Sequence, residues 1–474
     1  MKIKFWGTRG SLPAPLKADA IAEKITQAIL GLPDSINTKD PQAVKAYVDS
    51  LPPFSHGTAG GNTPCVELSA GDDVFIIDAG TGLRDLGVEL MKGPCGEGKC
   101  TIHLFLSHCH WDHIQGFPQF RPALTKGNRI VIYSIHDAKE ALERQQDPLT
   151  WPISLSFMSA EKHFVHLEVG EPFSIGNLRI NTILNDHPGD AYSFRFEDQH
   201  SVMVYASDVE YKRLNEASMQ PHIEFFRDAD ALIFDAQFVL KQVWGSRMHW
   251  GHSSSLIGVD LARKAGVKKL ILCHYDPGAT DAELEEVLST TYAYQEQDPT
   301  LPTCEIMLSY EGLELDLTPP DAIDVRFEDR TSILTPRHIS SEQSISQLEQ
   351  ELAYLAQHKT PTSSIIDLSH IETLNIADIQ ALLRLHQKRD RDTLVLVTPS
   401  SNVIQVVKLS GYADYFAIYN SVETALSAAQ IREALNLPGH IIKERYQIEH
   451  TVGKGPCLLY TSDAADEEDS VDLG

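Results

Sequence analysis

The sequence predicts an α/β protein with two domains, and three observations support this fold class. The chain has 474 residues, of which 42% are hydrophobic, so it is long enough for more than one packed core. Short β-branched or aromatic runs alternate with segments of helical spacing along most of the chain. A proline-containing segment after Thr318 interrupts this alternation, because proline lacks a backbone donor and favours extended chain.

The first predicted domain, residues 1–318, is rich in strands bounded by Gly, Asp or Asn. Ten strands are predicted, over residues 3–7, 65–69, 74–78, 102–107, 130–134, 164–167, 178–184, 202–206, 231–235 and 270–274. Helical spacing covers 22–32 and 41–51, which form an apparent insertion, and 254–265, where the helix is expected to end at Gly266.

The second predicted domain, residues 323–435, follows a linker at 319–322. Strands are predicted over 365–369, 394–398 and 415–419, and helices over 344–357, 376–388, 402–409 and 422–435. This spacing suits a small open sheet with helices stacked on it. Residues 436–456 are interpreted as a further linker.

Composition limits the partners and the compartment. Lys and Arg number 40 against 66 Asp and Glu, a net charge of −26, which disfavours bulk nucleic acid held through its phosphate backbone. The densest basic run, Arg263 to Lys269, is interpreted as the exposed end of a helix. No apolar stretch is long enough for a membrane helix, and no signal peptide is evident, so we expect a soluble, cytoplasmic protein. Cys95 and Cys100 are then expected to be free thiols.

The last 18 residues, 457–474, resemble the translated read-through of a sequencing adapter. They carry six acids and no base, so the other 456 residues keep a net charge of −20. We expect this tail to be a disordered artefact, with a natural acidic tail as the alternative, and the native sequence after about residue 456 to be missing.

One segment concentrates metal-binding side chains. The predicted strand at 102–107 runs into His108-Cys-His110-Trp-Asp112-His113. Three imidazoles and one carboxylate within six residues, where a strand gives way to a loop, can converge on one or two cations. The spacing therefore predicts a metal site.

This spacing is the HxHxDH motif of the metallo-β-lactamase superfamily. The resemblance extends over residues 1–318 and includes Phe5-Trp-Gly-Thr-Arg-Gly-Ser11, Gly60-Gly-Asn-Thr-Pro-Cys65 and Ile76-Ile-Asp-Ala-Gly-Thr-Gly-Leu83. These segments look like the phosphodiesterase branch, which includes cyclic-phosphate phosphodiesterases and ribonuclease Z. The resemblance implies an αββα sandwich with the metals at one edge of two facing sheets.

The resemblance also implies the metal ligands. One ion would lie among His108, His110 and His187, a second among Asp112, His113 and His274, with Asp208 between them. Zinc, manganese and iron all suit such a shell, with zinc preferred. Asp78 resembles the family's structural aspartate, which braces the ligand loop.

Two cations about 3.5 to 4 Å apart can lower the pKa of a water and stabilise charge on a phosphoryl group, so phosphodiester hydrolysis is the expected reaction. Trp250-Gly-His-Ser-Ser254 resembles the ribonuclease Z segment that supplies the general acid, which makes His252 the candidate proton donor. Asp235 is expected to orient His252, although a capping role fits it nearly as well. The expected catalytic residues are Asp112, Asp208, Asp235 and His252.

The resemblance to the phosphodiesterase branch implies a small cyclic phosphate, such as a cyclic nucleotide, as the substrate. A tRNA substrate is disfavoured, because the acidic chain shows no basic arm like that of ribonuclease Z. An ester or lactone hydrolase of the same superfamily is the enzymatic alternative. The alternative from another class is a signalling scaffold with a vestigial metal site. The loops at 115–127 and 149–163 carry no readable substrate code.

The second domain resembles the STAS fold of anti-sigma-factor antagonists, through the segment from Ser364 to His386, Leu394 to Pro399 and Val407 to Gly411. That family's phosphorylatable serine turn aligns with Asn375 to Asp378, which holds no hydroxyl. We therefore expect partner docking, self-association or ligand sensing without phosphorylation there, or a purely structural appendage. After it, Glu444 to Gly455 looks like the cut-off start of a protein-kinase nucleotide loop, with only two glycines.

Overall fold

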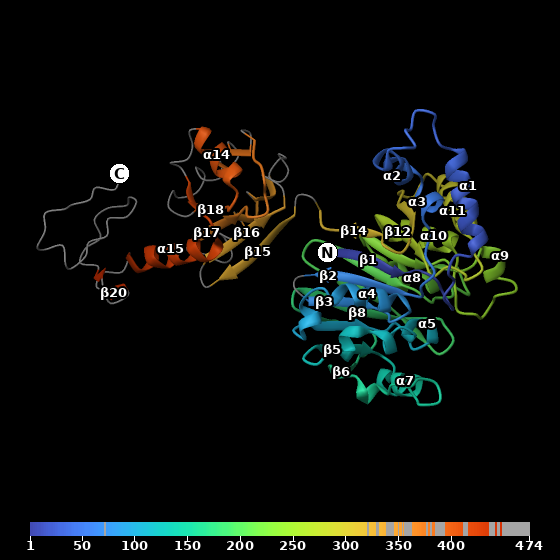
Figure 1. Cartoon of the computed structure of the whole chain (residues 1–474). Coiled ribbons are helices and arrows are strands. Elements are labelled where there is room, and N and C mark those ends of the chain that lie inside the picture. Colours follow the sequence, from blue (N-terminus) through green and yellow to red (C-terminus); the bar gives the residue numbers. More distant parts are fainter. Residues whose placement is uncertain are drawn as a thin grey trace, which may run out of the picture. The chain divides into compact units, whose positions relative to one another are not determined.

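The chain divides into two units, Met1–Thr318 and Pro319–Gly474, each with its own hydrophobic cores (Figure 1). The computed structural model describes residues 1–70, 73–319, 322–328, 331–337, 346–348, 350–352, 354, 363–375, 378–379, 382–383, 394–410, 416–435, 441–442 and 446–447. The expected kinase-like segment lies largely outside these residues, and the 457–474 tail lies wholly outside them.

The first unit contains two seven-stranded sheets. The first sheet has the order β14-β1-β2-β3-β4-β5-β6, and the second has the order β13-β12-β11-β10-β9-β8-β7. The strands of the first sheet are β1 Lys2–Gly7, β2 Cys65–Ala70, β3 Asp73–Ile77, β4 Thr101–Phe105, β5 Arg129–Ser134, β6 Glu161–His166 and β14 Glu314–Asp316. Those of the second are β7 Phe173–Ile175, β8 Leu178–Asn185, β9 Ala191–Glu197, β10 Val202–Ala206, β11 Ala231–Asp235, β12 Lys269–Cys273 and β13 Glu305–Leu308.

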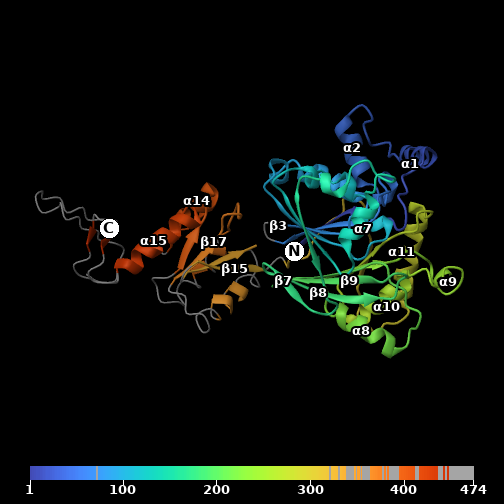
Figure 2. The same cartoon turned by 90° about the horizontal axis from the view of Figure 1, so that it is seen from below.

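The two sheets face each other, and helices cover their outer faces (Figure 2). Strand β11 shows why: Ala231 and Ile233 join the core between the sheets, whereas Leu232 and Phe234 join the core under the helices. A strand buried on both faces is expected to be largely apolar, and the first four residues of β11, Ala231 to Phe234, are all apolar. The helices are α4 Gly82–Leu90, α5 Trp111–Ile114, α6 Arg121–Leu124, α7 Ala138–Gln145, α8 Glu216–Phe226, α9 Leu240–Val243, α10 Ser255–Ala265 and α11 Asp281–Glu296. The expected αββα sandwich is confirmed.

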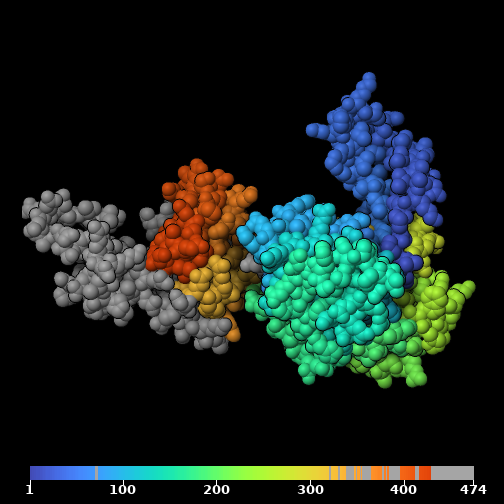
Figure 3. Space-filling view, turned by 60° about the horizontal axis from the view of Figure 1, so that its bottom comes forward, coloured from blue at the N-terminus to red at the C-terminus, as the bar shows by residue number. Residues whose placement is uncertain are grey.

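The insertion between β1 and β2 forms a protrusion on the first unit (Figure 3). It contains α1 Ala18–Leu30, α2 Pro41–Ser50 and α3 Pro53–His56. Neither α1 nor α2 contains a buried residue. Lys24 ties α1 to the rest of the unit, because its Nζ lies 2.9 Å from an oxygen of Asp281 at the start of α11.

The second unit has a five-stranded sheet of order β15-β16-β17-β18-β19. Its strands are β15 Ile323–Glu328, β16 Thr331–Pro336, β17 Ser363–Asp367, β18 Leu394–Val397 and β19 Ala417–Tyr419, and its helices include α14 Ser401–Leu409 and α15 Val422–Leu435. A short hairpin of β20 Ile441–Ile442 and β21 Tyr446–Gln447 follows. The described positions of the helix predicted at 344–357, which are 346–348, 350–352 and 354, are helical. The helix predicted at 376–388 lies largely outside the described residues, and its described positions, 378–379 and 382–383, are helical.

Two sequence-based expectations about single residues are wrong. Cys95 and Cys100 form a disulfide rather than free thiols, because the short turn Pro94–Glu97 brings their Cα atoms to 4.8 Å. Arg263 is buried rather than exposed. The seven residues from Arg263 to Lys269 therefore do not form a continuous basic surface.

In the two seven-stranded sheets and the five-stranded sheet, six strands were not expected from the sequence: β7, β9, β13, β14, β15 and β16. Short edge strands such as β7 and β14 have three residues each, too few to show a pattern. Among the helices within the described residues, none combines the length and apolar content needed to cross a bilayer.

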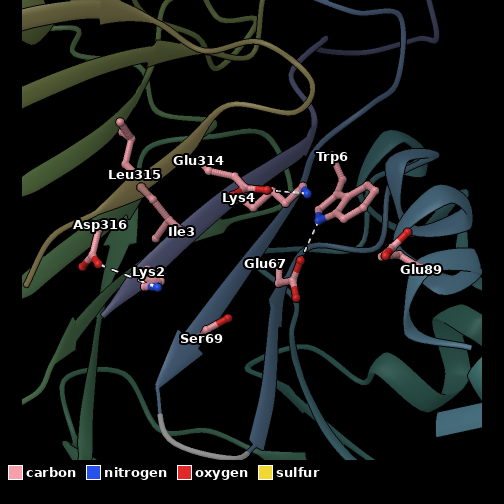
Figure 4. A pocket seen from close by; sticks show the side chains of 10 residues that line it. All are labelled: Lys2, Ile3, Lys4, Trp6, Glu67, Ser69, Glu89, Glu314, Leu315 and Asp316. Carbon is pink, nitrogen blue, oxygen red and sulfur yellow. Dashed lines mark hydrogen bonds and ion pairs between the residues drawn. The ribbon is translucent and has the colours of Figure 1, made fainter. Parts of the chain in front are cut away.

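A surface hollow of about 470 Å³ lies over β14, β1 and β2 (Figure 4). Its polar groups pair with one another: Lys4 Nζ lies 2.5 Å from Glu314 Oε1, and Trp6 Nε1 donates to Glu67 Oε2 at 2.8 Å. Burial raises the pKa of Glu67. None of the residues that line this hollow belongs to the predicted metal site, so we assign it no function.

Candidate metal centre

The predicted ligands all follow strand ends. His108 to His113 follow β4, His187 follows β8, Asp208 follows β10 and His274 follows β12. Strands β10, β11 and β12 are parallel, so their carboxyl ends lie at one edge of the second sheet. The chain thus brings residues from four segments to one place.

His108, His110 and His187 form one group, in which the candidate ligand atoms lie within 4.8 Å of one another. His187 Nε2 lies 3.0 Å from His110 Nδ1. The other nitrogen of His187 donates to the carbonyl oxygen of Gly251 at 2.8 Å, which fixes its tautomer and turns the Nε2 lone pair toward the group.

Asp112, His113 and His274 form the second group. His274 Nε2 lies 3.2 Å from Asp112 Oδ2 and 3.3 Å from His113 Nε2. His113 Nδ1 donates to Asp78 Oδ2 at 2.7 Å, so its Nε2 faces the group as an acceptor.

Asp208 lies between the two groups. Its carboxylate oxygens are 3.2 Å from His113 Nε2 and 3.4 Å from His274 Nε2. The same carboxylate is 3.8 Å from His108 Nε2 and 3.9 Å from His187 Nε2. A single carboxylate therefore reaches both groups, which is the geometry a bridging ligand requires.

The donor set fits divalent cations. Tetrahedral ligands about 2.1 Å from an ion lie about 3.4 Å apart, close to the separations within the second group. His108 Nε2 is buried and has no hydrogen-bond partner, a costly state that an ion would relieve. Neutral imidazoles and carboxylates suit zinc, manganese or iron, so the residues fit a divalent metal without selecting one.

The cluster attracts positive charge. Burial of the His274 imidazole lowers its pKa, but the carboxylates of Asp208 and Asp112 outweigh this effect and raise the pKa of His274 to about 9. The facing histidines hold the pKa of Asp208 well below its usual range, although burial works in the opposite direction. Protons on these histidines compete with a cation, so metal affinity should fall as the pH is lowered.

Asp78 braces the ligand loop as the resemblance implied. It is fully buried and accepts hydrogen bonds from His113 Nδ1, from both the backbone and the hydroxyl of Ser107, and from the Tyr205 hydroxyl, all between 2.7 and 2.9 Å. Tyr205 comes from the second sheet, so this carboxylate also joins the two sheets beneath the cluster.

His252 and Asp235 lie beside the cluster. His252 Nδ1 donates to Asp235 Oδ2 at 2.9 Å, which leaves its Nε2 available for proton transfer. Asp235 also accepts from the backbone of Val209 and Gln237. The His252 ring centroid lies 5.0 Å from that of His274 and 5.2 Å from that of His187.

Three positioning residues, Gly10, Ser11 and Glu210, were not found from the sequence. Gly10 lies so close to His274 that a Cβ there would be 2.4 Å from Nδ1, and the Ser11 amide donates to Asp112 Oδ2 at 2.7 Å. Glu210 is buried and accepts from the amides of His249 and Gly251 at 2.9 and 3.1 Å. Gly10 and Ser11 belong to the family-like segment from Phe5 to Ser11, and Glu210 follows Asp208 by two residues. The sequence therefore indicated these residues only through their closeness to a family motif or to a predicted ligand.

In the second unit, the segment aligned with the STAS serine turn is held by a reciprocal pair of hydrogen bonds. The Asn375 amide donates to Asp378 Oδ2 at 2.8 Å, and the Asp378 amide donates to Asn375 Oδ1 at 3.0 Å. This is a side-chain cap at a helix start. The two residues between them, Ile376 and Ala377, lie outside the described part of the chain.

Comparisons with known proteins agree with this architecture. Residues 74–275 match the beta-lactamase superfamily domain, and residues 322–425 match the STAS domain. Ribonuclease Z from Thermoplasma acidophilum is 24% identical over 261 residues, which cover 47% of this chain and 83% of that protein. Ribonuclease BN from Escherichia coli is 22% identical over 263 residues, which cover 45% and 82%.

A solved structure, the metallo-beta-lactamase fold protein YhfI from Bacillus subtilis, is 19% identical and has a TM-score of 0.45, covering 66% of this chain and 98% of that one. The two domain matches confirm the resemblances seen in the sequence. The chain therefore contains a metallo-beta-lactamase superfamily domain followed by a STAS domain, and the first of these is a metal-dependent hydrolase.

Proposed function

We propose that the first domain is a dinuclear phosphodiesterase that hydrolyses a cyclic nucleotide or a related small cyclic phosphate. The observation that carries this proposal is the position of Asp208, within 4 Å of histidines in both ligand groups. In this proposal His108, His110 and His187 hold one ion, and Asp112, His113 and His274 hold the other.

Two divalent cations held in this way would activate a water and stabilise the negative charge that develops on the phosphoryl group. Asp208 and Asp112 orient the reacting groups and are the proposed catalytic carboxylates. His252 donates a proton to the leaving oxygen, and Asp235 holds the imidazole in the tautomer that keeps Nε2 facing the site. Hydrolysis of a cyclic phosphodiester then yields a single product, in which the ring is open: a phosphate monoester and a hydroxyl group that carries the proton donated by His252.

RNA is the second candidate substrate, because the curated relatives are named ribonuclease Z and ribonuclease BN. Those names weaken the expectation, based on net charge, that bulk nucleic acid is disfavoured. The STAS domain is proposed to regulate the hydrolase in a signalling protein by binding a protein partner or a second copy of the chain.

The test uses the full chain reconstituted with zinc or manganese and bis(p-nitrophenyl) phosphate as substrate. Asp208→Ala should reduce turnover to the background rate, whereas Asp186→Asn should retain it, because Asp186 is half-exposed and pairs with Lys212 outside the cluster. His252→Ala should slow diesters with alkyl leaving groups by about 10² to 10⁴ and nitrophenyl diesters far less, because nitrophenolate needs no proton.

Cyclic nucleotides, a structured RNA, a lactone and a thioester would then be compared with the wild-type protein. Turnover of cyclic nucleotides alone supports the proposal, and turnover of RNA alone favours the second candidate. Absence of phosphodiester turnover with two metals bound would point to ester hydrolysis. If no metal binds, the hydrolase proposal is wrong and the scaffold interpretation replaces it.

A further inference from the structure

The segment between β11 and α10 exposes an unusual number of large apolar side chains. We define residues 239–251 as the α9 loop; Figure 2 shows α9 projecting at the edge of the first unit. The exposed fractions are 51% for Val239, 48% for Trp244, 43% for Met248 and 52% for Trp250. Such exposure within one short loop is typical of a ligand-contacting surface.

Three side chains of this region contact one another. The guanidinium carbon of Arg247 lies 4.1 Å from the ring centroid of Trp250 and 5.5 Å from that of Phe238. The Phe238 and Trp250 rings meet edge to face, with centroids 6.3 Å apart. We call Phe238, Arg247 and Trp250 the aromatic–guanidinium cluster.

This cluster adjoins the candidate metal centre. The Phe238 ring is buried and lies 5.6 Å from the ring of His252, the proposed proton donor, in an edge-to-face contact. A surface that begins at Trp250 therefore continues through Phe238 to the reacting groups. Glu210 holds the far end of the loop by accepting from the amides of His249 and Gly251, so the cluster is anchored as well as exposed.

The Arg247 guanidinium has no carboxylate partner among the residues that the structure describes. Within the part of the chain that the structure describes, no acidic side chain lies within ion-pair distance of its guanidinium, although acids outnumber bases in this protein. Its contacts are instead with the two aromatic rings. A guanidinium presented in this way can attract a phosphate and stack on a planar ring at the same time.

We infer that the aromatic–guanidinium cluster binds the base of a nucleotide whose phosphodiester lies at the metal centre. This inference rests on the proposed function and assigns its substrate class, a nucleotidyl phosphodiester. Every nucleobase has a face that can stack on an indole or a guanidinium, so the contact selects for a base without selecting its identity. The exposed indole of Trp250 provides the stacking surface, and Arg247 provides charge complementarity to the anionic ligand.

The test compares adenosine 5′-monophosphate with ribose 5-phosphate, which share a sugar phosphate and differ by the base. Binding to the zinc-reconstituted full chain is measured by isothermal titration calorimetry. Adenosine monophosphate should bind about tenfold more tightly, as expected for one stacked base. Trp250→Ala and Arg247→Ala should each remove most of this advantage, and Trp250→Phe should restore part of it.

Trp244→Ala is the matched control, because Trp244 is equally exposed in the same loop and is not part of the cluster. It should keep the tenfold ratio. Equal binding of the two ligands by the wild-type protein, or a ratio that survives both Trp250→Ala and Arg247→Ala, would overturn the inference. Hydrolysis of bis(p-nitrophenyl) phosphate, measured in the same preparations, separates the two failures: turnover without a base preference rejects only the base site.

Discussion

Asp208 and His274 both adopt left-handed backbone conformations, with φ angles of 58° and 59°, and Asp78 does the same at 60°. Each residue directly follows or closely follows a strand of the sandwich. Non-glycine residues in this region cost about 1 to 3 kcal/mol each and persist where surrounding contacts fix them. Here the contacts are those of the ligand cluster, so the strain accompanies the sharp turn that directs these side chains to the sheet edge.

Hydrogen bonds to the outer ring nitrogens complete this arrangement at the scale of single residues. His187, His113 and His252 each donate from Nδ1, to Gly251, Asp78 and Asp235 respectively. Each bond fixes a tautomer and leaves Nε2 as the nitrogen that faces the centre. The orientation of these three imidazoles is therefore set by the hydrogen bonds at Nδ1 and not by the Nε2 atoms that face the centre.

His222, on α8, should make stability depend on pH. Burial against Tyr211 and Phe226 lowers its pKa to about 4, below the value near 6.5 expected in the unfolded chain. As the pH falls below 6.5, the His222 imidazole takes up a proton in the unfolded chain while it stays neutral in the folded protein. The stability that the neutral, buried His222 contributes above pH 6.5 is therefore lost as the pH falls toward 4. The loss should be on the order of 2 to 3 kcal/mol.

The measurement is urea unfolding between pH 4 and 7.5. His222→Gln should flatten the decline below pH 6.5 relative to the wild type, and His166→Gln, which removes a histidine whose side chain is 63% exposed, serves as the control. If the free energies of unfolding of the wild type and His222→Gln fall in parallel as the pH is lowered, burial does not lower the pKa of His222 and the prediction is wrong.

At the scale of elements, the site depends on strands that end at one edge. Asp208, Asp235 and His274 follow or end the neighbouring parallel strands β10, β11 and β12. The distances between these three side chains are therefore set by the spacing of strands in the sheet and not by their separation in the sequence. Helix α10 covers the outer face of this sheet, and Gly258 allows a close approach: a Cβ there would lie 2.6 Å from the Phe234 ring.

Arg263 should be essential to this helical layer. Its guanidinium donates to the carbonyl oxygens of Gln295, Asp298, Leu301 and Pro302, which terminate α11 and lead into β13. Arg263→Ala would remove the donor from the buried carbonyl of Gln295 and from three partly buried carbonyls, at a cost of about 3 kcal/mol in unfolding free energy. The effect would be measured by guanidinium unfolding followed by circular dichroism.

Lys264→Ala provides the comparison, because Lys264 is the exposed neighbour of Arg263 on the same helix. It should change the unfolding free energy by less than about 0.5 kcal/mol. Equal midpoints for the two variants would mean that the carbonyls find other donors and that Arg263 is not a structural clamp.

At the scale of the whole molecule, two units with separate cores are expected to unfold in two transitions. Metal binding to the folded first unit should stabilise that unit alone, by about 4 kcal/mol when free metal exceeds its dissociation constant a thousandfold. Chelation should therefore lower the midpoint of one calorimetric transition and leave the other, assigned to the STAS unit, unchanged.

His108→Ala provides the internal control, because a protein unable to bind metal should melt at the chelated midpoint with or without zinc. Removal of all bound metal without a shift in either transition would contradict a structural contribution from the metal. A shift in both transitions would mean that the two units do not unfold independently.

The α/β class, the strands with strong apolar patterning and the seven ligand candidates could be read from the sequence. The ligand motif is local, so His108, His110, Asp112 and His113 stand out by spacing, while His187, Asp208 and His274 needed the resemblance. Edge strands β7 and β14 are too short to give a pattern, and the burial of Arg263 depends on carbonyls about 30 residues away. Local composition gave no sign of these contacts.

The sequence by itself determined the chemical groups available to this protein and the order of its elements, because periodicity and motif spacing are local properties. Tertiary structure decided which side chains meet. Glu210 reaches the amides of His249 and Gly251, and Phe238 links Trp250 to His252, only because the loops after β10 and β11 return to one edge of the sheet. Such contacts arise from chain segments far apart in sequence, and their energy depends on burial and geometry that only the folded chain provides.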